Sequence, residues 1–94
     1  MKNADIVKAR IALAKLAHAD LPAPILMRLD PTLSAAEAVI DEAGTYPEDS
    51  EEGARYLAER ADVPACAIPA LPEIRMSWVD LDVLRGIVEF EEVG

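Results

Sequence analysis

The sequence predicts a small α+β protein that is mainly helical, with about three helices and a two- or three-stranded sheet. Three stretches within the first 61 residues have helical composition and spacing, three prolines interrupt residues 62–75, and residues 87–91 partly alternate as in a strand. An all-α fold is the alternative, because one helix over 80–93 would use the same final residues. A chain of 94 residues predicts a single domain over 1–94, with 62–75 as a possible internal hinge.

The first helix is expected from residue 5 to about residue 19. Asn3 is a good N-cap, and the stretch is rich in Ala, Leu, Lys and Arg, which favour helix. The prolines at 22 and 24 end it, because proline cannot continue a helix. Its larger apolar residues occupy two sides, which predicts contacts from two directions. These sides are Ile6, Leu13 and Leu16, and Val7 and Ile11.

The second helix is expected to end at Gly44, a residue typical of helix C-termini. Two starts are open: Asp30 as N-cap with Pro31 at the first helical position, or a capping box from Ser34 to Glu37. Residues 25–29 before it form a short apolar run that fits either a buried strand or a helical turn. The residues expected to face inward are Leu33, Ala36, Val39 and Ile40.

The rest of the chain predicts one more helix and several short elements. Asp49 or Ser50 is expected to cap a third helix over residues 51–61, with Ala54, Leu57 and Ala61 on its buried face. The prolines of 62–75 favour an extended course. Beyond them we expect a strand over 74–79, a helical turn over 81–85 capped by Asp80, and a strand over 87–91.

Charge is distributed unevenly along the chain. The formal net charge is −9, yet residues 1–30 sum to +2 and residues 31–94 to −11. Such a surface does not suit free nucleic acid, whose phosphates need Lys and Arg. A basic protein surface, such as one that normally binds DNA, is the expected partner. The alternative is that the acidic residues only keep the protein soluble.

The sequence predicts no catalytic residues, no metal and no cofactor. The single histidine, His18, and the single cysteine, Cys66, are about 48 residues apart and carry no recognisable catalytic signature. One His and one Cys cannot supply the usual ligands of a zinc site. The acidic run at 48–52 lacks the alternating acids and central glycine of a calcium loop. We therefore expect a protein that is not an enzyme.

Candidate partner-binding residues are the acids of the later part of the chain and the single tryptophan. Trp78 follows Arg75 and Met76, and these three residue types are enriched at interface hot spots. The alternative for Trp78 is the one large ring of a thin core. The predicted partner-binding set is Glu48, Asp49, Glu51, Glu52, Glu59, Trp78, Glu89, Glu91 and Glu92.

Both ends of the chain resemble a family of small phage and prophage proteins of uncharacterised role. The similarity lies in residues 6–17 with Leu21-Pro22-Ala23, and in residues 74–77 and 80–90. The family's middle is one long charged helix that pairs with the first. Here Asp30-Pro31 and Gly44 are expected to break that stretch. The resemblance implies a phage or mobile-element origin and supplies no catalytic residues.

Together these features predict a small acidic interaction protein in the host cytoplasm. The expected function is that of an inhibitor, similar to an anti-CRISPR protein or a DNA mimic, which docks on a basic surface of a host defence complex. The alternative is a structural or assembly protein of a phage particle, which would self-associate or bind another virion protein. We expect no direct nucleic-acid or membrane partner, because the chain is acidic and has no long apolar run. A homo-oligomer is compatible with either role.

Overall fold

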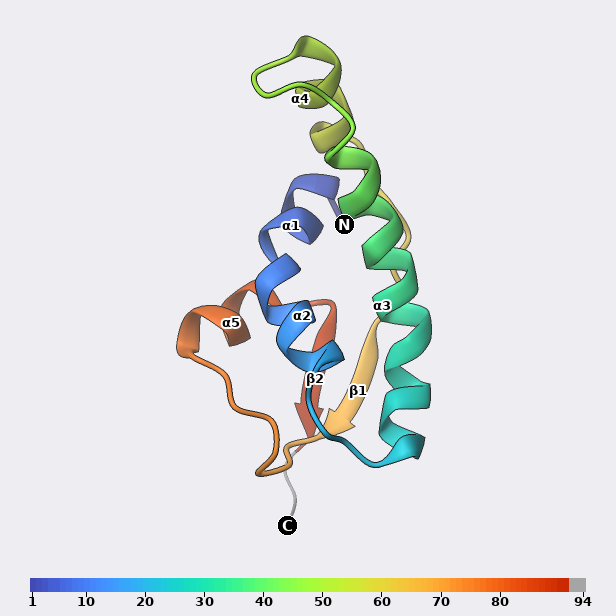
Figure 1. Ribbon diagram of the computed structural model, residues 1–94, viewed down its shortest axis with the longest axis vertical. Coiled ribbons are helices and arrows are strands. Elements are labelled where there is room, and N and C mark those ends of the chain that lie inside the picture. Colours follow the sequence, from blue (N-terminus) through green and yellow to red (C-terminus); the bar gives the residue numbers. More distant parts are fainter. Residues whose placement is uncertain (92–94) are drawn as a thin grey trace.

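The computed structural model describes residues 1–91 and confirms a mainly helical α+β fold (Figure 1). Within these residues, five helices accompany a two-stranded parallel sheet. The molecule is elongated, with principal extents of 47 × 24 × 19 Å. The elements in chain order are α1 (Asn3–Lys8), α2 (Arg10–Ala17), α3 (Ala23–Ala43), α4 (Glu51–Ala58), β1 (Cys66–Pro69), α5 (Trp78–Val83) and β2 (Val88–Glu91).

The predicted first helix is present as two shorter helices, α1 and α2, joined at Ala9. Ala9 keeps helical torsion angles and is fully buried, so the joint is a slight irregularity rather than a turn. The predicted core residues Ile6, Leu13 and Leu16 are buried as expected. The second predicted side is only partly realised, because Ile11 is 62 % exposed and does not enter the core.

The expected break at Asp30-Pro31 is wrong, since α3 runs through Pro31 as one helix of 21 residues. Proline removes one backbone hydrogen bond, which leaves the carbonyl of Met27 without its helical partner. Pro31 and Met27 are both exposed, so water can bind that carbonyl. A continuous buried stripe stabilises the helix on its other side: Ile25, Leu29, Thr32, Ala36 and Val39.

A two-stranded parallel sheet pairs β1 with β2, in the register Cys66–Val88 to Pro69–Glu91. Cys66 and Ala70 donate backbone hydrogen bonds to this partner, so Pro69 faces the free edge of β1, where it needs no N–H. The sequence predicted β2 but placed no strand at β1. The predicted strand over 74–79 is wrong, because 74–77 are irregular and Trp78 begins α5. The alternative helix over 80–93 is also wrong as far as residue 91.

The connection from β1 to β2 contains α5, as parallel strands require a crossover. Ser77 and Asp80 form a reciprocal capping box at its start, so the cap lies three residues before the predicted one. Gly86 follows the helix with a φ of +81°, a conformation in which glycine carries no steric penalty. Leu84, Ile87 and Val88 then enter the core.

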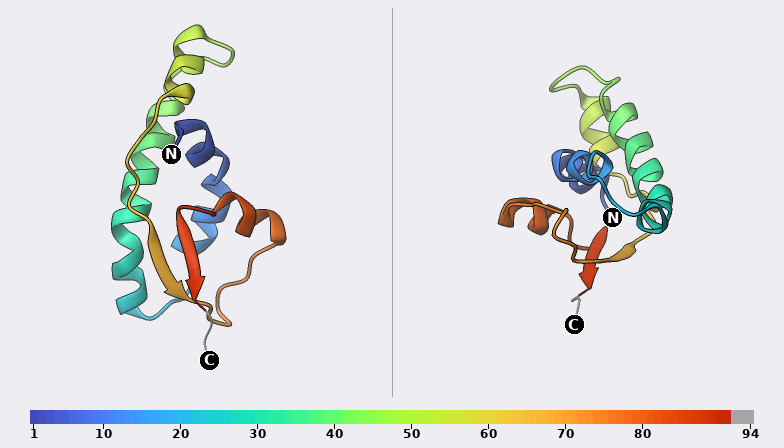
Figure 2. Two further views of the ribbon diagram at one scale, coloured as in Figure 1. Left: turned by 180° about the vertical axis from the view of Figure 1, so that it is seen from behind. Right: turned by 60° about the horizontal axis from the view of Figure 1, so that its bottom comes forward.

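The core lies between α1–α2, α3 and the sheet. Residues 59–65 run along α3 into β1 (Figure 2), and the hydroxyl of Thr32 donates a 2.6 Å hydrogen bond to the carbonyl of Pro64. In contrast, α4 projects beyond this core and contains no buried residue. It begins at Glu51 with Ser50 as its N-cap, one of the two predicted caps, and ends at Ala58 rather than 61. Of its predicted buried face, Ala54 is exposed and Leu57 is only half-buried, as is Tyr56.

Polar bonds from the N-terminus hold α4 in place. Asn3 is 97 % buried, and its side-chain amide donates to the carbonyl of Tyr56 at 2.8 Å. The backbone N–H of Asn3 donates to Glu59, and the N–H of Ala61 donates to Met1. The thin apolar contact and this small set of bonds anchor α4 only weakly to the core.

Candidate protein interface

One end of the elongated molecule is strongly acidic. The segment 41–59 contains the last turn of α3, the following loop and α4, which Figure 1 shows at the end opposite the sheet. It contains seven acids and one base, Arg55, which gives a net charge of −6 out of −9 for the whole chain. All seven acidic side chains are exposed. We call this surface the acidic end: Asp41, Glu42, Glu48, Asp49, Glu51, Glu52 and Glu59.

Helix electrostatics explain only some of these acids. Glu51 and Glu52 occupy the first turn of α4, where the helix dipole favours negative charge, and Glu51 pairs with Arg55 at 3.9 Å. Asp41 and Glu42 occupy the last turn of α3, where the dipole opposes them and no basic residue compensates. Glu37 lies one turn before Asp41, so this like-charged pair repels. The helix dipole and this repulsion therefore make negative charge at the end of α3 unfavourable.

A cleft with aromatic and acidic walls opens between the end of α3 and α4. It has a volume of about 330 Å³ and is lined by Tyr46, Tyr56, Arg55 and three glutamates. The two tyrosine rings lie 5.4 Å apart with a tilt of 32°. Burial, with a contribution from the carboxylate of Glu42, raises the pKa of Tyr56 to about 12. Ring faces and carboxylates both attract cations. The glutamates are Glu42, Glu52 and Glu59.

The structure divides the predicted partner-binding set into separate places. Glu48, Asp49, Glu51, Glu52 and Glu59 lie together at the acidic end. In contrast, Glu89 and Glu91 lie on β2 in the sheet, which Figure 1 shows at the opposite end. Both are exposed, and their register opposite Ala67 and Pro69 puts them on one face. Glu92 lies outside the described residues.

Trp78 is separate from both acidic regions. It begins α5 and is 70 % exposed, so it is not the central ring of the core. Val79 and Leu81 on the same helix are also exposed, at 63 % and 43 %. This helix lies beside α2 (Figure 1), and Lys15 of α2 pairs with Asp80 of α5. The Lys15 ammonium and the Ser77 backbone lower the pKa of Asp80 below its ordinary value.

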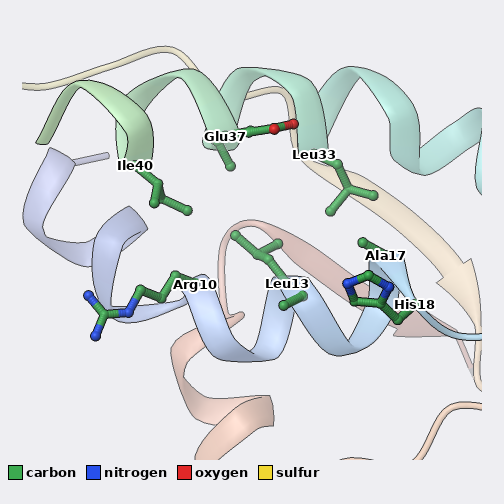
Figure 3. Close-up of a pocket in the computed structure, with 9 residues that line it drawn as sticks. Arg10, Leu13, Ala17, His18, Leu33, Glu37 and Ile40 are labelled. Atoms are coloured by element: carbon green, nitrogen blue, oxygen red, sulfur yellow. The ribbon is translucent and has the colours of Figure 1, made fainter. Parts of the chain in front are cut away.

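Cys66 and His18 have separate surroundings. The Cys66 thiol is buried, donates to the carbonyl of Arg28 at 3.3 Å, and has a pKa raised by that burial. His18 is exposed and lines an open pocket of about 270 Å³ between α2 and α3. Figure 3 shows Leu13, Leu33 and Ile40 pointing into this pocket, with the guanidinium of Arg10 directed away. The lining is mainly apolar, and His18 and Glu37 are also part of it.

The described residues 1–91 contain no group of three or more His, Cys, Asp or Glu side chains arranged to hold a metal ion. No described helix is both long enough and apolar enough to span a bilayer. The partner-binding set predicted from the sequence does not include Asp41, Glu42 or the tyrosine pair. The sequence does indicate the two acids, because an acid pair two residues before Gly44 is unfavourable at a helix C-terminus.

Comparison with protein-family models, with curated proteins and with solved structures finds no match for this chain.

Proposed function

We propose that this protein is a non-enzymatic inhibitor whose acidic end binds a basic, nucleic-acid-binding surface of a host defence complex, as anti-CRISPR proteins and DNA mimics do. The observation that carries the proposal is the concentration of −6 charges in residues 41–59, all on exposed side chains at one end of the molecule. Carboxylates held in this way compete with phosphates for the Lys and Arg residues of such a surface.

The unfavourable acids of α3 support a binding role over simple solubility. Solubility requires charge anywhere on the surface, including positions where it also stabilises a helix. Asp41 and Glu42 instead occupy the one end of α3 where negative charge costs stability. Charges that oppose the fold are typical of functional sites, where a partner supplies the compensating cations.

The tyrosine-lined cleft provides an anchor for one cationic side chain of the partner. An Arg or Lys entering between α3 and α4 would meet the faces of Tyr46 or Tyr56 and the three surrounding glutamates. Arginine fits best, because its planar guanidinium stacks on rings and forms paired bonds with carboxylates. The resemblance to phage and prophage proteins is consistent with a target among the defence systems of a bacterial host.

The test is a competition experiment with matched charge variants. A purified CRISPR effector complex is titrated with labelled DNA in the presence of this protein, at about 50 and 200 mM salt. The variant D41K/E42K changes the acidic end, and the control E89K/E91K makes the same change of net charge on the sheet. We expect wild-type protein and the control to displace DNA, with weaker displacement at high salt, and the D41K/E42K variant to fail.

Two results would overturn the proposal. Equal loss in both variants would show that net charge alone determines binding. Full competition by the D41K/E42K variant and by an E51K/E52K variant would exclude the acidic end altogether. If the effector complex is not the target, each variant is used to capture proteins from a host lysate. The nucleic-acid-binding complexes that salt elutes are then compared between the variants.

A structural or assembly role in a phage particle is the second candidate, favoured by the exposed apolar side chains of α5. It predicts that the protein is found in purified particles and that its contacts involve Trp78 rather than Asp41 or Glu42. Absence from particles, together with loss of target binding in the D41K/E42K variant, would decide for the inhibitor.

A further inference from the structure

Beyond the proposed function, an apolar surface lies on α5 and the adjacent part of α2. Trp78, Val79 and Leu81 are 70 %, 63 % and 43 % exposed, and Ile11 of α2 is 62 % exposed. Ile11 lies one helical turn before Lys15, the residue that binds Asp80, and so belongs to the side of α2 that faces α5. We call these four side chains the α5 face. Large apolar groups grouped in this way are typical of interaction sites.

A hollow adjoins the α5 face and shares Leu81 with it. The hollow has a volume of about 410 Å³ and lies between the segment 70–76, α5 and β2. Trp78 and Leu81 are three residues apart on one helix, so the indole projects from the same side as the rim of the hollow. The apolar lining consists of Leu71, Ile74, Met76, Leu81 and Phe90.

We propose that this chain forms a symmetric dimer in which Trp78 of each copy inserts into the hollow of the other. An interface with two-fold symmetry must be self-complementary, so one face must supply both the projecting group and its receptor. The α5 face and its hollow satisfy this requirement within a few residues. A large indole in an apolar pocket is also the usual form of an interface hot spot.

The charges around the α5 face favour a second copy over a basic partner. Asp80 is paired with Lys15, and Asp82 lies 3.6 Å from Arg85, so both acids of α5 already have a cation. The acidic end lies apart from α5, beyond the core (Figure 1). Two copies of a chain with net charge −9 repel each other, and the two acids of α5 add little to that repulsion because each is paired.

The expected dimer is weak and reversible. The four exposed side chains provide roughly 400 Å² of apolar area per copy, below the roughly 800 Å² per partner of a standard stable interface. Higher salt screens the repulsion between the acidic copies, so we expect it to strengthen the dimer. Binding of the acidic end to a basic partner has the opposite salt dependence, which keeps the two proposals distinguishable.

The experiment combines sedimentation velocity with tryptophan fluorescence over a protein concentration series. Trp78 is the single tryptophan of the chain, so its emission reports directly on the interface. We expect emission to shift to shorter wavelength and acrylamide quenching to fall over the concentration range in which the dimer forms. W78A is expected to raise the dissociation constant at least about tenfold. M27A, which removes an apolar side chain that is 75 % exposed on α3, is the matched control and should leave dimerisation unchanged.

A pair of complementary variants tests the insertion itself. Ala70 is exposed at the hollow, so A70F fills the hollow and leaves Trp78 intact. Neither W78A nor A70F should dimerise alone. In a mixture, A70F supplies an indole and W78A supplies an open hollow, so the two variants should associate with each other more tightly than either does with itself. Circular dichroism checks that both variants are folded. A protein that stays monomeric with unchanged emission, a W78A variant that dimerises normally, or a mixture no tighter than its components would overturn the proposal.

Discussion

The acidic end contains the C-terminus of α3 and the N-terminus of α4, where the helix dipole acts on acids in opposite ways. Reversing the charge of one acid at each terminus is therefore expected to change the stability of the fold in opposite directions. Asp41 lies in the last turn of α3, and Glu51 in the first turn of α4. D41K and E51K change the net charge by the same amount and alter exposed side chains less than twenty residues apart. Any general effect of lowering the net charge is therefore common to both variants. The difference between them isolates the position of the charge relative to the helix dipole.

The expected change in the free energy of unfolding has two contributions, and each has the opposite sign in D41K and E51K. A charge in a terminal turn contributes about 0.3–1 kcal/mol, favourable or unfavourable according to its sign. In D41K, the repulsion between Glu37 and Asp41 becomes an attraction, whereas in E51K the Glu51–Arg55 pair becomes a repulsion. Such pairs contribute about 0.2–0.5 kcal/mol each. Because reversing a charge turns each contribution from unfavourable to favourable or the reverse, we expect D41K to stabilise the fold by about 1–3 kcal/mol and E51K to destabilise it by a similar amount at low salt.

The assay is thermal and urea unfolding followed by circular dichroism, with amide hydrogen exchange of α4. For a chain of this size, 1 kcal/mol corresponds to about 4–8 °C in Tm. Because α4 has no buried residue, part of the E51K effect is expected as faster exchange within α4 rather than as a lower global Tm. The difference should shrink in 1 M salt, where the screening length is about 3 Å. Equal shifts in both variants, or a difference that is insensitive to salt, would refute the reasoning.

Three further predictions concern other residues. Replacing Gly86 with Ala should cost about 1–2 kcal/mol in urea unfolding, because φ is +81° there and the new Cβ would lie 3.2 Å from the Met1 side chain; a neutral effect would contradict this backbone conformation. In a Y46F variant, absorbance at 295 nm should show Tyr56 ionising near pH 12, and stability should fall as pH rises from about 10, where the unfolded tyrosine already ionises. Because Lys15 and Ser77 lower the pKa of Asp80, its stabilising contribution is present at neutral pH and is lost as pH falls below about 4, so D80N should reduce the acid sensitivity of unfolding.

Local patterns in the sequence predicted the helices well where burial and capping agreed. The N-cap of α4 at Ser50 and the buried residues of α1 and α2 follow from capping preferences and spacing. The predicted break at Pro31 is wrong because burial of a continuous apolar stripe outweighs the one backbone hydrogen bond that the proline removes. Apolar or small residues at 25, 29, 32, 36 and 39 continue at helical spacing across the proline, and this stripe was visible in the sequence.

The sheet could not be predicted as completely. β1 is four residues long and contains Pro69, and its partner β2 begins 22 residues later with a helix between them. Nothing local identifies such a parallel pairing, because its stability depends on burial of Cys66 and Ile68 against α3. The exposure of Trp78 was open for the same reason, since residue type does not determine which large side chain the core excludes.

The acidic end and the α5 face are separate in space, so one molecule can use both surfaces at the same time. A dimer formed through Trp78 would leave both acidic ends free, because α4 and α5 lie in separate parts of the molecule (Figure 1). Two acidic ends in one particle would bind a repeated basic surface with an avidity that neither end has alone. W78A should therefore weaken binding to a target with two basic sites by much more than binding to a target with one. This comparison measures the coupling between the surfaces, because the variant leaves every residue of the acidic end unchanged.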